Sequence, residues 1–140
     1  MAAPRRNYRV FLSHAATDSW VARQLRRSMI EQGAAVFLDE ASIAIGADFE
    51  QKIRQSLRRS NELVVLLTPW ALERHYVWVE IGAAWGMGMP IIAVLHGVTP
   101  RQLSELPNTP VLLKRRNLIE LNEIDRYLVQ LKRRVQDAVG

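Results

Sequence analysis

Glu80 is the only charged residue in an apolar stretch, residues 76–86, which reads YVWVEIGAAWG. No Lys or Arg lies three or four positions away, where a helical neighbour would have to be. A helix of a soluble protein normally gathers its charges on one wet face, and this stretch offers no such face. The carboxylate therefore lies either at the rim of a cleft or at a helix start, where negative charge is favourable. The residues alone leave both readings open.

Other residues that could do chemistry lack the patterns that the chemistry needs. His14, His75 and His96 show no metal-ligand spacing, and the absence of cysteine excludes a Cys-based zinc site, so we expect no metal. Ser13 precedes His14, but adjacent side chains on a strand point to opposite faces, and no G-x-S-x-G elbow is present. Neither a phosphate-binding GxxxxGK[ST] loop nor a dinucleotide-binding GxGxxG is found. These absences argue against acyl transfer and against the common nucleotide-binding loops.

The elements that must position these residues alternate regularly along the chain. Apolar runs predict five strands, at residues 8–13, 34–38, 62–68, 90–97 and 117–121. A periodicity of 3.6 residues predicts the helices between them, at residues 18–32, 48–59, 72–86 and 123–138. A short helical turn is expected at residues 100–106. Each crossover is too long for a hairpin. The pattern predicts one α/β domain over residues 1–140, a five-stranded parallel sheet with helices on both faces.

Composition limits the classes of partner. The 140 residues are 49% apolar, which suffices for a core, and no apolar run approaches the length of a membrane span or a signal peptide. We therefore expect a soluble, cytoplasmic protein with no membrane contact. The net charge of +5 raises nucleic acid as a partner. The basic doublets are dispersed, however, and no aromatic residues interleave with them as a base-stacking platform would require, so nucleic-acid binding is not expected.

Polar residues cluster where the predicted strands end. Ligands of open parallel sheets bind outside the carboxyl ends of the strands. Those ends here are Ser13-His14, Asp39-Glu40, Thr68-Pro69-Trp70 and His96-Gly97. Glu80 lies on the helix that follows one of these exits and can face the same crevice. A phosphoacceptor receiver domain would need an aspartate where Thr68 stands, which excludes that class. Trp70 and Trp85 are expected to pack in the core rather than to stack on bases.

Four motifs occur together in order and spacing: YRVFLSHA (8–15), DEASIAIGADF (39–49), SNELVVLLT (60–68) and YVWVEIGAAW (76–85). Together they resemble the Toll/interleukin-1 receptor (TIR) domain in its bacterial form, over residues 8–138. The resemblance implies a flavodoxin-like three-layer sandwich. Some members of that family only self-associate, whereas others cleave the nicotinamide–ribose bond of NAD⁺ with a glutamate that Glu80 matches. The tryptophan usual four residues upstream is replaced by Tyr76, which puts substrate preference in doubt.

The resemblance also implies which residues surround the substrate and what assembles. Glu80 would be catalytic, and the substrate would be bound by Ser13, His14, Asp39, Gly46 and Tyr76. Ile43 and Ile45 are apolar residues in a polar loop and would serve self-association. NAD⁺ would be a substrate, with no separate cofactor.

The expected partners are further copies of the chain and a separate sensor or effector protein, with a role in anti-phage defence. Two alternatives remain: a non-enzymatic TIR–TIR interaction module, and a deoxyribosyltransferase acting on nucleosides.

Overall fold

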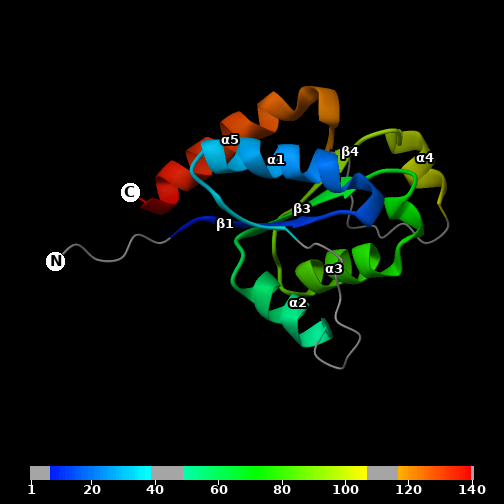
Figure 1. The fold of residues 1–140 in the computed structure, drawn as a ribbon, viewed down its shortest axis with the longest axis horizontal. Coiled ribbons are helices and arrows are strands. Elements are labelled where there is room, and N and C mark those ends of the chain that lie inside the picture. The colour runs from blue at the N-terminus through cyan, green and yellow to red at the C-terminus, as the bar shows by residue number, and fades with distance from the viewer. Residues whose placement is uncertain (1–6, 39–48, 107–116, 140) are drawn as a thin grey trace.

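Five parallel strands form the centre of the computed structural model, which describes residues 7–38, 49–106 and 117–139 (Figure 1). The strand order across the sheet is β2-β1-β3-β4-β5. The strands are β1 (Arg9–Ser13), β2 (Ala35–Leu38), β3 (Glu62–Leu67), β4 (Ile91–Leu95) and β5 (Leu118–Glu120). Every residue of β3 is buried, as is typical of a central strand covered on both faces.

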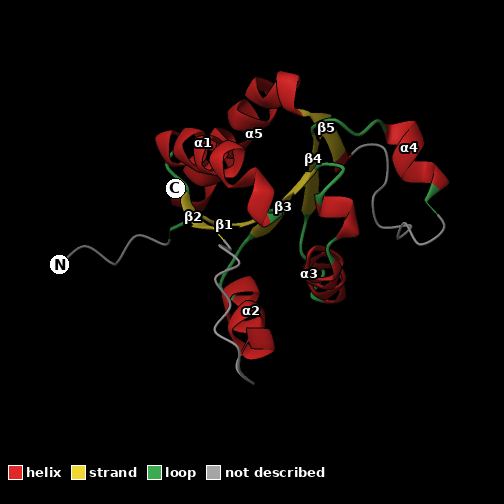
Figure 2. Cartoon of the chain, turned by 45° about the vertical axis from the view of Figure 1, so that its right-hand side comes forward, coloured by secondary structure: helices red, strands yellow, loops and turns green. Residues whose placement is uncertain are grey.

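Helices cover both faces of this sheet, so the chain has three layers. α1 and α5 lie on one face and α2 and α3 on the other (Figure 2). The helices are α1 (Ser19–Glu31), α2 (Phe49–Arg58), α3 (His75–Gly86), α4 (Pro100–Glu105) and α5 (Ile124–Val139). Short 3₁₀ turns precede three of them, at Ala16–Asp18, Ala71–Glu73 and Leu121–Glu123. The predicted flavodoxin-like α/β fold is confirmed.

Side-chain alternation along β1 divides the core into two halves. Val10 and Leu12 pack in the cluster under α1 and α5, whereas Phe11 packs in the cluster under α2 and α3. Ser13 shares the parity of Phe11, so its side chain points to the α2–α3 side. The last residue of β1 is thereby directed toward the layer that carries Glu80.

Two details of the sequence analysis are wrong. The third helix was expected from residue 72, but residues 71–73 form a 3₁₀ turn and α3 begins at His75. Trp70 and Trp85 were expected in the core, but their exposed fractions are 54% and 62%. The pattern of residues 76–86 does not distinguish a buried helix face from an exposed one, because Glu80 is the only charged residue in that stretch.

A buried carboxylate fastens α5 to the amino end of the sheet. Glu62, the first residue of β3, accepts hydrogen bonds from the hydroxyls of Tyr8 and Tyr127, the latter at 2.6 Å. Arg134 donates to both of its oxygens, from Nε at 2.8 Å and from Nη2 at 3.2 Å. The Arg134 guanidinium also lies 5.6 Å from the centre of the Tyr127 ring. This network joins β3 to a helix more than sixty residues away in sequence.

The network makes stability sensitive to alkaline pH. Burial, and to a lesser degree the Glu62 carboxylate, raises the pKa of Tyr127 well above its ordinary value. The hydroxyl therefore ionises in the unfolded chain before it does so in the folded one. Stability from this group is complete below about pH 10 and falls by roughly 1.4 kcal/mol per pH unit above it. Urea unfolding across this range should show a steeper loss for the wild type than for Tyr127→Phe; parallel losses would contradict this account.

Candidate active site

The end of β1 and the first turns of α3 meet at the carboxyl edge of the sheet. The Tyr76 hydroxyl donates a 3.0 Å hydrogen bond to the backbone carbonyl of His14. Ala15 packs in the same cluster as Val77 and Ile81 of α3. Tyr76 lies one helical turn before Glu80, so their Cβ atoms are about 5–6 Å apart. The structure thus brings Tyr76 to the strand exit that holds Ser13 and His14, with Glu80 one helical turn further along α3.

Glu80 is completely buried, with an exposed fraction of 0%, although it lies on a helix with exposed residues on either side. Its neighbours Val79 and Gly82 face solvent, whereas Val77, Ile81 and Ala84 face the sheet. The carboxylate therefore belongs to the inner face of α3. A carboxylate held in such surroundings acts on a nearby charge more strongly than it would in water.

The Ser13 hydroxyl is a second buried polar group at this exit. Its exposed fraction is 0%, and its Oγ has no hydrogen-bond partner among the described residues. Buried polar atoms nearly always have a partner, so such an atom often marks a position where a ligand or an ordered water is bound. His14 beside it is also buried. The strand exit thus holds polar groups that the apolar core gives no reason to bury.

A hydrogen bond that the sequence analysis missed holds two strand exits together. Thr68, just after β3, donates from Oγ1 to Oδ2 of Asp18 at 2.6 Å. The Thr68 Oγ1 atom also accepts a hydrogen bond from the backbone N–H of Ala71 at 3.0 Å. Asp18 occupies the N-cap position of α1, but its side chain makes no capping bond and is buried instead. This contact joins the turn after β1 to the turn that leads toward α3.

Thr68→Val should therefore loosen the site as well as destabilise the fold. The substitution keeps the shape but leaves the buried Asp18 carboxylate without its donor, which costs about 1–3 kcal/mol. Chemical denaturation measures this loss, and Thr99→Val offers a comparison at the start of α4, where the lost hydroxyl caps a short exposed helix. A Thr68→Val loss no larger than the measurement error would show that the Asp18 contact contributes nothing to stability.

The remaining predicted residues are distributed as follows. Asp39, Ile43, Ile45 and Gly46 lie outside the described residues, so their predicted roles stay predictions. His75 is exposed at the start of α3 and His96 is exposed after β4. Within residues 7–38, 49–106 and 117–139, no group of three or more His, Cys, Asp or Glu side chains could hold a metal ion.

A parallel five-stranded α/β sandwich with a buried glutamate beside the exit of its first strand defines the class of this protein. A family model described as "TIR domain" matches residues 10–133, which is most of the chain. The chain belongs to the TIR domain family.

Two curated relatives are enzymes by name. The chain is 26% identical over 101 residues to the 2' cyclic ADP-D-ribose synthase BtTIR of Bacteroides thetaiotaomicron, covering 69% of this chain and 35% of the relative. It is 26% identical over 98 residues to the probable 2' cyclic ADP-D-ribose synthase BdTIR of Brachypodium distachyon, covering 69% and 44%. The chain therefore spans less than half the length of either relative.

Solved structures share the fold at lower identity. The TIR domain of a Toll-related receptor from Hydra magnipapillata has a TM-score of 0.65 and 19% identity, over 94% of this chain and 98% of that one. A 2-desoxiribosyltransferase from Leishmania mexicana has a TM-score of 0.54 and 16% identity, over 63% and 64%. These two similarities concern the fold alone.

The described helices include none that is both long and apolar enough to cross a membrane.

Proposed function

We propose that this TIR domain cleaves the nicotinamide–ribose bond of NAD⁺ and releases nicotinamide with ADP-ribose or a cyclic isomer of it. The observation that carries the proposal is the complete burial of Glu80 on the inner face of α3, beside the exit of β1. The names of the two curated relatives give the substrate class. NAD⁺ is a substrate in this proposal, not a resident cofactor.

The reaction asks little of acid–base groups. The bond between C1' of the ribose and the ring nitrogen breaks, and its electron pair leaves with neutral nicotinamide, so no general acid is needed. Positive charge develops on the ribose, and a fixed carboxylate near it stabilises the transition state. Water, or a hydroxyl of the same ADP-ribose, then forms the new bond at C1' and loses a proton.

The chain's own residues divide this work. Glu80 provides the negative charge and accepts hydrogen bonds from ribose hydroxyls. The buried Ser13 hydroxyl donates a hydrogen bond to the substrate; this role is assigned to it because its Oγ has no partner among the described residues. Tyr76 positions the end of β1 through its bond to the His14 carbonyl, and its ring lies one turn from Glu80. Asp39 and Gly46 complete the substrate contacts.

Assembly and biological setting are further parts of the proposal. Copies of the chain associate through Ile43 and Ile45, and activity follows assembly. A separate sensor or effector protein triggers the assembly in the cytoplasm, and the consumption of NAD⁺ or the cyclic product serves antiviral defence in a bacterium. Neither nucleic acid nor a membrane takes part.

One observation favours the alternative of a non-enzymatic interaction module. The outer face of α3 exposes Val79, Trp85 and, just beyond the helix, Met87. The one charged residue between His75 and Met87, Glu80, is buried on the inner face. Exposed apolar surface of this kind is typical of protein contacts. An interaction module would bind its partner through this surface.

A substrate panel separates the functions. The purified chain is incubated with NAD⁺, with deoxynucleosides plus a free base, and with buffer, and products are identified by chromatography and mass. We expect nicotinamide from NAD⁺ only, and a co-product whose mass shows whether water was added. Base exchange between deoxynucleosides would indicate a deoxyribosyltransferase, and the absence of any product would favour the interaction module.

A further inference from the structure

A groove of about 280 Å³ lies at the amino end of the sheet, away from the site of Glu80. It lies between the edge strand β2 and the end of α2, and its lining includes Arg9, Phe37, Ser56, Arg59 and Ser60. Arg9 is the first residue of β1, whereas Ser13 is the last. Arg9 lies four steps before Ser13, about 13 Å along β1, whereas Phe37 pairs with Phe11, two steps before Ser13. The described residues that line the groove include neither Ser13 nor Glu80, so it is a separate site from the candidate active site.

Two guanidinium groups, of Arg9 and Arg59, give the groove a positive charge. Among the described residues, those that line it include no Asp or Glu. Within the described part of the chain, neither Arg9 nor Arg59 forms a salt bridge or a side-chain hydrogen bond, although Arg101, Arg126 and Arg134 each have a carboxylate partner. The guanidinium group of arginine carries N–H donors in a fixed fork that matches the oxygens of a phosphate. The arrangement favours an anion with several acceptor oxygens.

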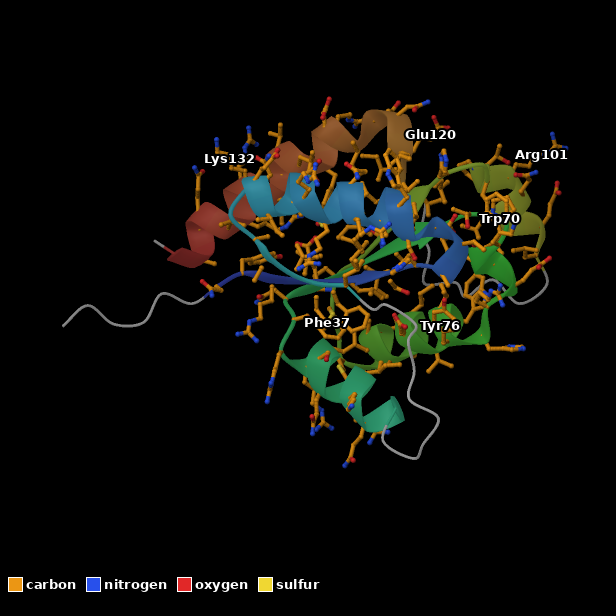
Figure 3. All side chains as sticks on the ribbon, in the orientation of Figure 1. Phe37, Trp70, Tyr76, Arg101, Glu120 and Lys132 are labelled. Carbon is orange, nitrogen blue, oxygen red and sulfur yellow. The ribbon has the colours of Figure 1, made fainter. Side chains whose placement is uncertain are left out.

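Two serine side chains and an aromatic ring lie beside the arginines in the groove, which favours a ligand that carries both polar groups and a flat ring. The Ser60 hydroxyl donates to the Ser56 carbonyl at 2.8 Å, and the Ser56 side chain also lines the groove. Phe37 has an exposed fraction of 46% although it is a large apolar side chain, and it lies on the side of the sheet that faces α2 (Figure 3). Its ring contacts the buried Phe11 ring, with centroids 5.1 Å apart, which fixes its position.

We propose that this groove binds a nucleoside monophosphate, with its phosphate between Arg9 and Arg59 and its base against the Phe37 ring. A ring fixed by Phe11 offers a flat surface at little entropic cost, and aromatic side chains stack on any base. The volume lies near the lower end of the range for small-molecule pockets, which suits a mononucleotide better than a dinucleotide. The inference goes beyond the proposed function and does not depend on it.

The test is a titration of the ¹⁵N-labelled chain with AMP, followed by two-dimensional NMR. Arg59→Gln removes one guanidinium and Phe37→Leu removes the ring. Arg58→Gln is the matched control, because Arg58, the last residue of α2, is exposed beside Arg59 and does not line the groove. We expect shifts at β2 and the end of α2. Each of the first two substitutions should weaken AMP binding about tenfold, the size of one charge-assisted or stacking contact, and the control should not.

Adenosine and inorganic phosphate, titrated separately, should each bind more weakly than AMP. Three results would overturn the proposal: no saturable AMP binding, shifts confined to the Ser13–Glu80 end of the sheet, or equal weakening by Arg58→Gln. Phosphate that binds as tightly as AMP would also overturn it, because the ring would then contribute nothing. The spectra of the free variants show whether each one is folded, so a loss of binding is separated from a loss of structure.

Discussion

Glu80→Gln should lower the rate of nicotinamide release from NAD⁺ by about 10²–10³-fold, the size of effect seen when one preorganised electrostatic contact to a transition state is removed. Glutamine keeps the shape and the hydrogen-bonding length of the side chain but removes its charge. Because the charge matters most when the ribose becomes positive, the substitution should reduce kcat far more than it weakens NAD⁺ binding. Steady-state kinetics with direct NAD⁺ binding measurements separates the two effects.

Glu73→Gln is the matched control for this substitution. Glu73 is exposed and ends the 3₁₀ turn just before α3, so its substitution removes the same charge seven residues earlier and leaves the buried face of α3 unchanged. Its activity should equal that of the wild type. Equal losses in both variants would show that the overall charge near α3, rather than the buried carboxylate, sets the rate, and the role assigned to Glu80 would be wrong.

Arg134→Met should destabilise the fold by about 3 kcal/mol, the lower end of the range for breaking a buried ion pair from one side. The Glu62 carboxylate has a relative exposure of 1% and would keep only its two tyrosine donors. We expect the lower end of the range because the Arg134 side chain is 35% exposed, so water already solvates part of the guanidinium and weakens the ion pair. Methionine retains most of the aliphatic stem and its packing.

Arg133→Met tests whether the loss comes from the pair or from a changed net charge. Arg133 is the exposed neighbour on α5 and forms no salt bridge among the described residues. Urea denaturation of both variants should show a large loss for Arg134→Met and a change within about 0.5 kcal/mol for Arg133→Met, as for most surface substitutions. Similar losses of unfolding free energy in the two variants would show that the Glu62 network does not stabilise the fold.

Local patterns were sufficient to predict the sheet and most of the helices. The run ELVVLLT predicts a strand buried on both sides, and β3 is the central strand of the sheet. Ile53 and Leu57 repeat at helical spacing and are both buried in the core. Glu80 could be singled out because an acid in an apolar stretch is conspicuous, and the structure buries it completely.

Interactions between distant segments could not be predicted in the same way. Glu62 also stands at the head of an apolar run, but its donors Tyr8 and Arg134 lie 54 and 72 residues away. Asp18 stands where a helix cap belongs, and only the tertiary fold shows that Thr68, fifty residues on, is its partner. A sequence pattern shows that a polar residue in an apolar run needs a hydrogen-bond partner. Which residue becomes that partner depends on how distant segments pack in the folded chain.

The most direct test of the central claim is the rate of nicotinamide release from NAD⁺, measured over a wide range of protein concentration for the wild type and Glu80→Gln side by side. The account predicts a wild-type rate that rises faster than linearly with protein concentration and a rate for the variant that is about 10²–10³-fold lower at each concentration. Wild-type release equal to that of the variant at every concentration, with both proteins folded, would contradict it and leave an interaction module in which Glu80 has no catalytic part.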